Sequence, residues 1–204
     1  MQRLRTSASD IDAWRRYLNP PIPDMEIELS DLLSQLRREM PPTDAMLAGT
    51  ALHAALERAA TGDHATLEAN GYTFHLDMDG EIDLPEMREI KGTRDYAIGD
   101  CTVTLVGQVD AIHGRRIEDH KFTSRFDAER FMSSYQWRIY LEVFGADTFR
   151  WNVFEGSETE PMTYRIYGFH QPVMHRYPGM GDDVVKAVAG FLDFARTHLP
   201  ERIG

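Results

Sequence analysis

The centre of the chain reads Gly107-Gln-Val-Asp-Ala-Ile-His-Gly-Arg-Arg-Ile-Glu-Asp-His-Lys-Phe-Thr123, and this pattern sets the expected architecture. Apolar residues lead into the middle from Val103 to Ile112, and Ile117 leads out of it. Glycine at position 114 marks a tight turn between the two halves. The stretch therefore predicts two β-strands joined as a hairpin.

The turn length decides which side chains share a face of this hairpin. A turn of two or four residues places Asp119 across from Gln108, so that Asp110, Asp119 and Lys121 project from the same side. The two acids are then diagonal neighbours, roughly 7–8 Å apart at Cβ, and can share a divalent cation. A three-residue turn would send Asp119 to the opposite face.

Two acids beside a lysine are suited to hydrolysing a phosphodiester. The acids hold Mg²⁺, and the lysine orients or helps to deprotonate a water and neutralises developing negative charge. The same residues also fit a solvated strand face, because charged side chains usually lie outside. Other parts of the chain must decide between these two interpretations.

Length and composition predict one soluble domain. The 204 residues are 42% hydrophobic and 27% charged, which is ordinary for a globular protein. No apolar run approaches the ~18 residues of a membrane span, and the first residues lack a signal peptide's apolar segment. We therefore expect a cytoplasmic protein without a membrane partner, in which 1–42 is a helical segment and 43–204 is the core of a single domain, 1–204.

The cysteine count and the charge exclude some classes of protein. One cysteine, Cys101, rules out an internal disulfide and a four-cysteine zinc or iron–sulfur site within one chain. The net charge of −11 argues against a protein that coats nucleic acid through bulk positive charge. An enzyme with a local basic groove stays possible.

The remaining pattern is helices, then a run of strands, a helix, two more strands and a closing helix. A connector at 19–23 and a hairpin turn at Asp79-Gly80 are expected from proline and Asp-Gly signals. Capping residues place helix ends at Ser7 or Ser9, Ser30, Thr43, Asp127 and Gly145. We expect helices within 6–17 and over 30–39, 44–60, 128–144 and 180–198. We expect strands over 72–78, 82–90, 101–109, 148–154 and 162–169, with a turn at 155–157. This order predicts an α+β fold, a central mixed sheet flanked by helices.

Two helices carry further candidate residues. His53 and Glu57 lie at i and i+4 of the early helix and share a face. They fit a surface pair or a buried histidine held by a carboxylate, or else a metal ligand oriented by its neighbour. Gly49, one turn earlier, would let the helix approach another backbone. Gln136 and Tyr140 also share a helix face, and a buried amide such as Gln136 needs partners.

Four pieces in order carry a resemblance to a known family. They are Gly49-Thr-Ala-Leu-His53, Gly107-Gln-Val-Asp110, Ile117-Glu-Asp-His-Lys121 and Gln136-Trp-Arg-Ile-Tyr140. Together they resemble the PD-(D/E)XK nuclease superfamily, and within it the RecB-like exonuclease branch. The resemblance implies a restriction-endonuclease-like core. The chain lacks the four cysteines of those relatives that hold an iron–sulfur cluster, so none is expected.

The resemblance also implies roles for individual residues. The metal ligands would be His53, Asp110, Asp119 and the main-chain carbonyl of His120, holding one or two Mg²⁺ or Mn²⁺ ions. Lys121 would be the catalytic lysine, Gln136 and Tyr140 would line the site, and Glu57 would support it.

The expected activity is that of a metal-dependent DNA exonuclease in recombination, repair or end processing, with a phage-type enzyme as one form of it. A structure-specific endonuclease acting on flaps or branches is an alternative, and so is a catalytically inactive nucleic-acid-binding module of the same fold. The expected partners are single-stranded DNA or the ends of duplex DNA, with a single-strand-annealing or single-strand-binding protein as a further possibility. The expected setting is a bacterial or phage-infected cell.

Overall fold

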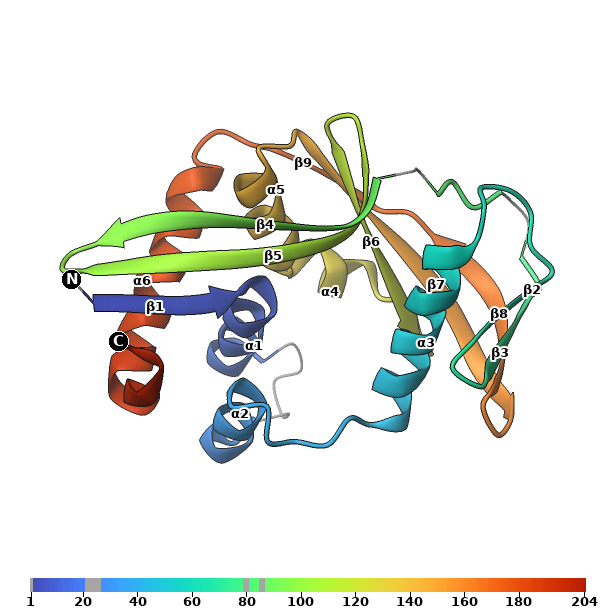
Figure 1. Ribbon diagram of the computed structural model, residues 1–204, viewed down its shortest axis with the longest axis horizontal. Coiled ribbons are helices and arrows are strands. Elements are labelled where there is room, and N and C mark those ends of the chain that lie inside the picture. Colours follow the sequence, from blue (N-terminus) through green and yellow to red (C-terminus); the bar gives the residue numbers. More distant parts are fainter. Residues whose placement is uncertain (1, 21–26, 79–80, 85–86) are drawn as a thin grey trace.

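The computed structural model describes residues 2–20, 27–78, 81–84 and 87–204, and within them one mixed sheet runs through the molecule (Figure 1). Its strands follow the order β1-β5-β6-β7-β8-β3-β2, with β4 paired to β5 and β9 paired to β7. Helices flank this sheet, as predicted for an α+β fold.

The strands are β1 (Gln2–Ser7), β2 (Thr66–Ala69), β3 (Tyr72–Leu76), β4 (Met87–Ile98), β5 (Cys101–His113), β6 (Arg116–Thr123), β7 (Thr148–Glu160), β8 (Thr163–His170) and β9 (Val173–His175). The helices are α1 (Ala8–Leu18), α2 (Leu29–Leu36), α3 (Asp44–Arg58), α4 (Ala128–Ser133), α5 (Gln136–Phe144) and α6 (Met180–His198), followed by a short 3-10 turn, Pro200–Arg202. Among the described residues, no helix is long and apolar enough to cross a membrane.

Two hydrophobic cores lie along the sheet. The larger core packs α1, α2, α5 and α6 against the half of the sheet built on β4 and β5. The smaller core packs α3 against β2, β3 and β8 at the other end. In Figure 1, α1 and α3 stand on either side of the point where β6 leaves the long β4–β5 ribbon. The fold therefore brings both helical groups to the central hairpin.

Local chemistry accounts for several helix ends. Ser7 and Asp10 form the capping box of α1, and the hydroxyl of Thr43 caps α3. Gly145 ends α5 in the left-handed conformation, at φ +62°. These ends and the span of α6 confirm the predictions made for them, and the single cysteine, Cys101, is buried on β5.

Other predicted elements were wrong. Strands β1 and β2 were not expected, and β4 starts at Met87 and continues to Ile98, beyond the expected end of that strand at residue 90. The expected cap Ser30 lies inside α2, whose N-cap is Glu28. The expected turn at 155–157 lies inside β7, where the pairing with β8 only shifts register, beside Gly156. The Asp79-Gly80 turn and most of the 19–23 connector lie outside the described residues.

The predicted helix over 128–144 is broken into α4 and α5 at Ser134 and Tyr135. Asp12 of α1 causes the break, because its Oδ1 accepts from the Ser134 hydroxyl at 3.0 Å and from the Tyr135 N–H at 2.7 Å. Ser134 adopts ψ 137°, which no α-helix continues. The break sets the direction of α5 and of the side chains it carries.

Candidate functional site

The central hairpin turns through two residues, Gly114 and Arg115. Its described pairs are Ala111 with Glu118, Ile112 with Ile117, and His113 with Arg116. Gly114 takes φ +61°, which suits a tight turn.

The expected pairing of Asp119 with Gln108 is wrong, because the observed register of β5 and β6 pairs Ala111 with Glu118. The register differs from the expected one by two residues, so the side-chain alternation is unchanged. Continuing the observed register past its last pair sets Asp119 opposite Asp110.

Asp110 lies where β5 and β6 separate. The pair next to it, Ala111 with Glu118, is the last described pair between the two strands. The N–H of His120 donates to Asp110 Oδ2. The other oxygen, Oδ1, lies 3.3 Å from His53 Nδ1 of α3. Burial raises the pKa of Asp110, but the hydrogen bond and positive charge of His53 outweigh it and lower the pKa to about 2. The same pair raises the pKa of His53, against the lowering effect of its burial.

Asp119 is held from two sides. Its side chain is almost fully buried, the Lys121 ammonium contacts Oδ2, and Gln136 Nε2 donates to Oδ1 at 3.1 Å. Gln136 also lies 3.1 Å from the hydroxyl of Tyr140, so α5 contributes both residues that were expected to line the site. Burial and the nearby charge of Asp110 raise the pKa of Asp119 to about 6, although Lys121 opposes the rise.

Lys121 is a charged group at neutral pH. Burial lowers its pKa, but the carboxylates of Asp119 and Asp110 outweigh burial and raise it above the ordinary value. Its ammonium also lies 5.4 Å from the ring centroid of Trp151 on β7. A third of the side chain is exposed, so the cation can reach a ligand in solvent.

The remaining predicted residues lie around this centre in different ways. The His120 side chain is buried, its Nδ1 lies 3.3 Å from Asn152 Nδ2, and burial lowers its pKa to about 4. Glu57 is exposed, and its main-chain carbonyl accepts from Arg88 at 2.8 Å. His53 is therefore oriented by Asp110 in place of Glu57. The expected role of Gly49 in close packing is wrong, since a Cβ there would meet nothing within 4 Å.

Sequence reasoning missed two residues that support the site. Asp12 fixes the start of α5, and Asn152 fixes the ring of His120 while donating to Glu118 at 2.9 Å. In the sequence, Asp12 fits the ordinary preference for acids in the first turn of a helix, and Asn152 is a single polar residue within a strand. Neither pattern signals a contact across the fold.

A second group of acids and histidine includes two residues of the hairpin itself, His113 on β5 and Glu118 on β6. Asp83, His113 and Glu118 place their ligand atoms within 4.8 Å of one another. Among the described residues, the predicted side-chain ligands His53, Asp110 and Asp119 do not meet that spacing. Arg116 and Arg150 contact the two oxygens of Glu118, at 2.8 and 2.7 Å. Because guanidiniums already neutralise it, this group is best understood as an ion-pair network.

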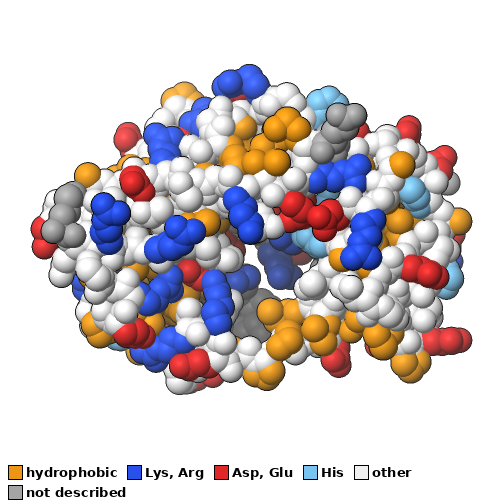
Figure 2. Space-filling model, viewed as in Figure 1, with side chains coloured by type: hydrophobic (Ala, Val, Ile, Leu, Met, Phe, Trp, Pro, Cys, Tyr) orange, Lys and Arg blue, Asp and Glu red, His pale blue; other side chains and the backbone are white. Residues whose placement is uncertain are grey.

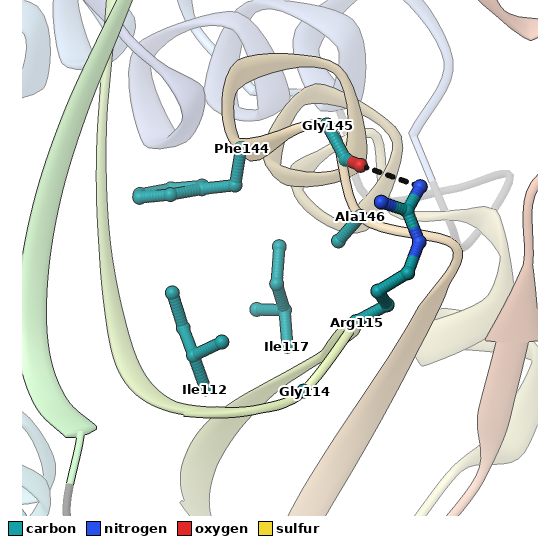
Figure 3. Close-up of a pocket in the computed structure, with 7 residues that line it drawn as sticks. All are labelled: Ile112, Gly114, Arg115, Ile117, Phe144, Gly145 and Ala146. Atoms are coloured by element: carbon teal, nitrogen blue, oxygen red, sulfur yellow. Dashed lines mark hydrogen bonds between the residues drawn. The ribbon is translucent and has the colours of Figure 1, made fainter.

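A small cavity under the hairpin turn is also separate from the candidate site. Figure 3 shows Ile112, Ile117 and Phe144 facing one another across it, with Gly114, Arg115, Gly145 and Ala146 completing the lining. Arg115 closes one side by donating to the carbonyl of Gly145 at 3.1 Å. Its lining is mostly apolar and offers no acid or histidine.

Comparisons with known proteins bear on the fold alone. No family model matches the chain, and no curated protein matches it. Among solved structures, the crystal structure of SSO0001 is similar, with a TM-score of 0.52 and 14% sequence identity over 90% of this chain and 73% of that one. At that identity the match is a likeness of fold.

Proposed function

We propose that this chain is a metal-dependent deoxyribonuclease with a restriction-endonuclease-like core, acting as a DNA exonuclease in recombination, repair or end processing. One observation carries the proposal. Four separate elements contribute two neighbouring sets of contacts, His53 with Asp110, and Lys121 and Gln136 with Asp119, and the charge of Asp110 acts on Asp119. These are the residue types that hydrolysis of a phosphodiester with a divalent cation requires.

The donor set fits a hard divalent cation. Asp119 Oδ2 is buried, and its polar partner among the described residues is the Lys121 ammonium, which forms an ion pair with it. Such an oxygen gains from an added cation, because a buried carboxylate without full hydrogen bonding is unstable as an ion. Carboxylates and a main-chain carbonyl suit Mg²⁺, and an imidazole makes Mn²⁺ suitable too. His53, Asp110, Asp119 and the carbonyl of His120 would hold the ion.

The bound ion would polarise the scissile phosphate and lower the pKa of an attacking water. Lys121 stabilises negative charge on the phosphate as the water attacks, because its raised pKa keeps it a cation. Gln136 holds Asp119 in place through its amide, and Asp110 orients the ring of His53. The N–H of His120 fixes Asp110 in turn.

Digestion of end-labelled DNA with Mg²⁺, Mn²⁺ or EDTA tests the activity. Cleavage should require the metal and fall about 100-fold or more in Asp119→Ala and in Lys121→Ala. The matched control is Asp83→Asn, which changes the second acidic group and should leave cleavage unchanged. Cleavage in EDTA, or full activity in both site variants, would reject the proposal.

Circular single-stranded DNA separates the exonuclease from a structure-specific endonuclease. An exonuclease needs an end and leaves the circle intact, whereas an endonuclease opens it. Binding of DNA and Mn²⁺ without cleavage of any substrate would instead favour the inactive binding module.

A further inference from the structure

The outer edge of β4 has no strand beside it among the described residues. Strand β4 pairs with β5 on one side, and the described backbone makes no hydrogen bond to its other side. In Figure 1, β4 runs along the margin of the sheet, with α6 behind it. A free strand edge presents a row of unpaired N–H and C=O groups. This edge is therefore open to pairing with a further strand.

Charged side chains are the main protection of this edge. Strand β4 is 12 residues long and contains no proline, and 90–98 pair with β5 in one unbroken register. Lys91 and Asp95 are exposed, and neither takes part in an ion pair among the described residues. Figure 2, seen from the same side as Figure 1, shows side chains of both charges over the part of the molecule where β4 and β5 lie. Such charges repel a partner strand unless it presents the opposite charges in register.

A second copy of β4 presents those charges. When two copies pair antiparallel about a two-fold axis through Thr93, residues at equal distances on either side of Thr93 lie opposite each other. Lys91 then faces the partner's Asp95, and the symmetry repeats this pair at the other end. Ile90 faces the partner's Tyr96 on the opposite face of the strand. Opposite charges, and aromatic with β-branched side chains, are favourable cross-strand pairs.

The neighbouring registers of this pairing oppose like charges. Because backbone groups alternate along a strand, a two-fold axis between two antiparallel copies passes through a residue. An axis through Gly92 sets Glu89 opposite the partner's Asp95. An axis through a charged residue sets that residue opposite its own copy, and this applies to Lys91, Arg94 and Asp95. Like charges directly opposite each other are destabilising, and an axis nearer either end pairs fewer residues, so the axis through Thr93 is favoured.

We infer that two copies of this chain form a symmetric dimer through their β4 edges, with Lys91 of each copy paired to Asp95 of the other. The sheet of one copy then continues into the sheet of its partner. Because the same edge is used on both sides, the contact closes on itself and assembly stops at two copies. The inference goes beyond the proposed function and does not depend on it.

Sedimentation velocity over a series of protein concentrations tests for this dimer. The wild type should approach the mass of a dimer as its concentration rises. Lys91→Glu sets like charges opposite each other at both ends of the pairing and should weaken dimerisation about tenfold. Adding Asp95→Lys exchanges the two charges and should restore dimerisation. The matched control, Lys186→Glu, reverses a 78% exposed charge on α6 and should leave dimerisation unchanged.

Crosslinking through introduced cysteines tests the register. Thr93 lies on the axis, so Thr93→Cys faces its own copy at a Cβ separation of about 4.5–5.5 Å, and mild oxidation should link the dimer. Ala97→Cys, also exposed on β4, lies about 27 Å from its copy and should not be linked. The native Cys101 is buried and does not compete.

Three results would overturn the inference. They are a wild type that stays monomeric at every concentration, a dimer that Lys91→Glu does not weaken or that the charge exchange does not restore, and crosslinking of Ala97→Cys as efficient as that of Thr93→Cys. None of them bears on the proposed nuclease, which the cleavage assays test separately.

Discussion

Replacing Lys121 by methionine tests the charge balance around the buried carboxylate of Asp119. The ammonium contacts Asp119 Oδ2, and the carboxylate is 3% exposed. Methionine keeps most of the side-chain length and removes the charge. Because a nearby cation favours the ionised carboxylate, its loss should raise the pKa of Asp119 above the present value of about 6.

The sign of the pH dependence follows from proton linkage. A carboxyl whose folded pKa lies above its unfolded value of about 3.9 takes up a proton on folding, so stability falls as pH rises through the folded pKa. In the wild type this fall from Asp119 ends near its pKa of about 6, and in Lys121→Met it should continue to higher pH. The variant should therefore match the wild type most closely in mild acid and lose stability toward alkaline pH.

The size of the effect can be bounded. Removing one partner of a fully buried ion pair costs about 3–5 kcal/mol. Lys121 is 33% exposed, so solvent screens the pair and a loss of about 1–2 kcal/mol is expected above neutral pH.

Urea unfolding of the metal-free protein over a series of pH values measures this difference. The matched control is Lys186→Met, whose ammonium is 78% exposed and lies 3.7 Å from Asp183, and which should change stability by less than about 0.5 kcal/mol at every pH. Adding Asp119→Asn to Lys121→Met should abolish the extra loss of stability that Lys121→Met shows toward alkaline pH. A loss that is the same at all pH values would refute the reasoning.

Three further predictions concern the supports of the site. Gly107→Ala should lower the free energy of unfolding in a urea titration by about 1–3 kcal/mol, because its Cβ would lie 3.1 Å from aromatic side chains of α5. Gly49→Ala, in open space on α3, should instead raise the free energy of unfolding by up to about 1 kcal/mol. Protonation of His120 should contribute a loss of about 3 kcal/mol to the stability of the metal-free protein between pH 6.5 and 4, because burial lowers its pKa to about 4 and the unfolded chain binds the proton more tightly. Asp119 acts in the opposite direction over this range, so the contribution is measured as the difference between pH series on the wild type and on His120→Asn. Arg150→Leu should lower the free energy of thermal unfolding by about 3 kcal/mol, because it removes one of the two guanidiniums that pair with the buried carboxylate of Glu118. An unchanged melting temperature would contradict this prediction.

Local signals in the sequence were enough to place much of the fold. Ser7, Thr43 and Gly145 act on neighbouring backbone groups, so their effects could be read without knowing the tertiary structure. The hairpin could also be predicted from adjacent residues, and the error of two residues in its register left the alternation of side chains between its faces unchanged. Strand β1 could not be placed in this way, because it exists through parallel pairing with β5, about a hundred residues along the chain.

The candidate site shows the same division. The sequence placed Asp110, Asp119 and Lys121 on one hairpin because strand alternation is periodic. It could not show that Asp110 would accept from the His120 N–H, or that Asp12 would break the helix that carries Gln136. Such contacts depend on where the chain brings distant groups together. The metal and the reaction stay predictions.

Calorimetric titration of the metal-free protein with Mn²⁺ tests the central claim most directly. The account predicts one or two bound ions in the wild type, binding at least tenfold weaker in Asp119→Asn, and unchanged binding in Asp83→Asn. Asp83 belongs to the second acidic group, where Arg116 and Arg150 already lie 3.3 and 3.6 Å from its carboxylate. No binding by the wild type, or loss of binding in Asp83→Asn with Asp119→Asn unaffected, would contradict the account.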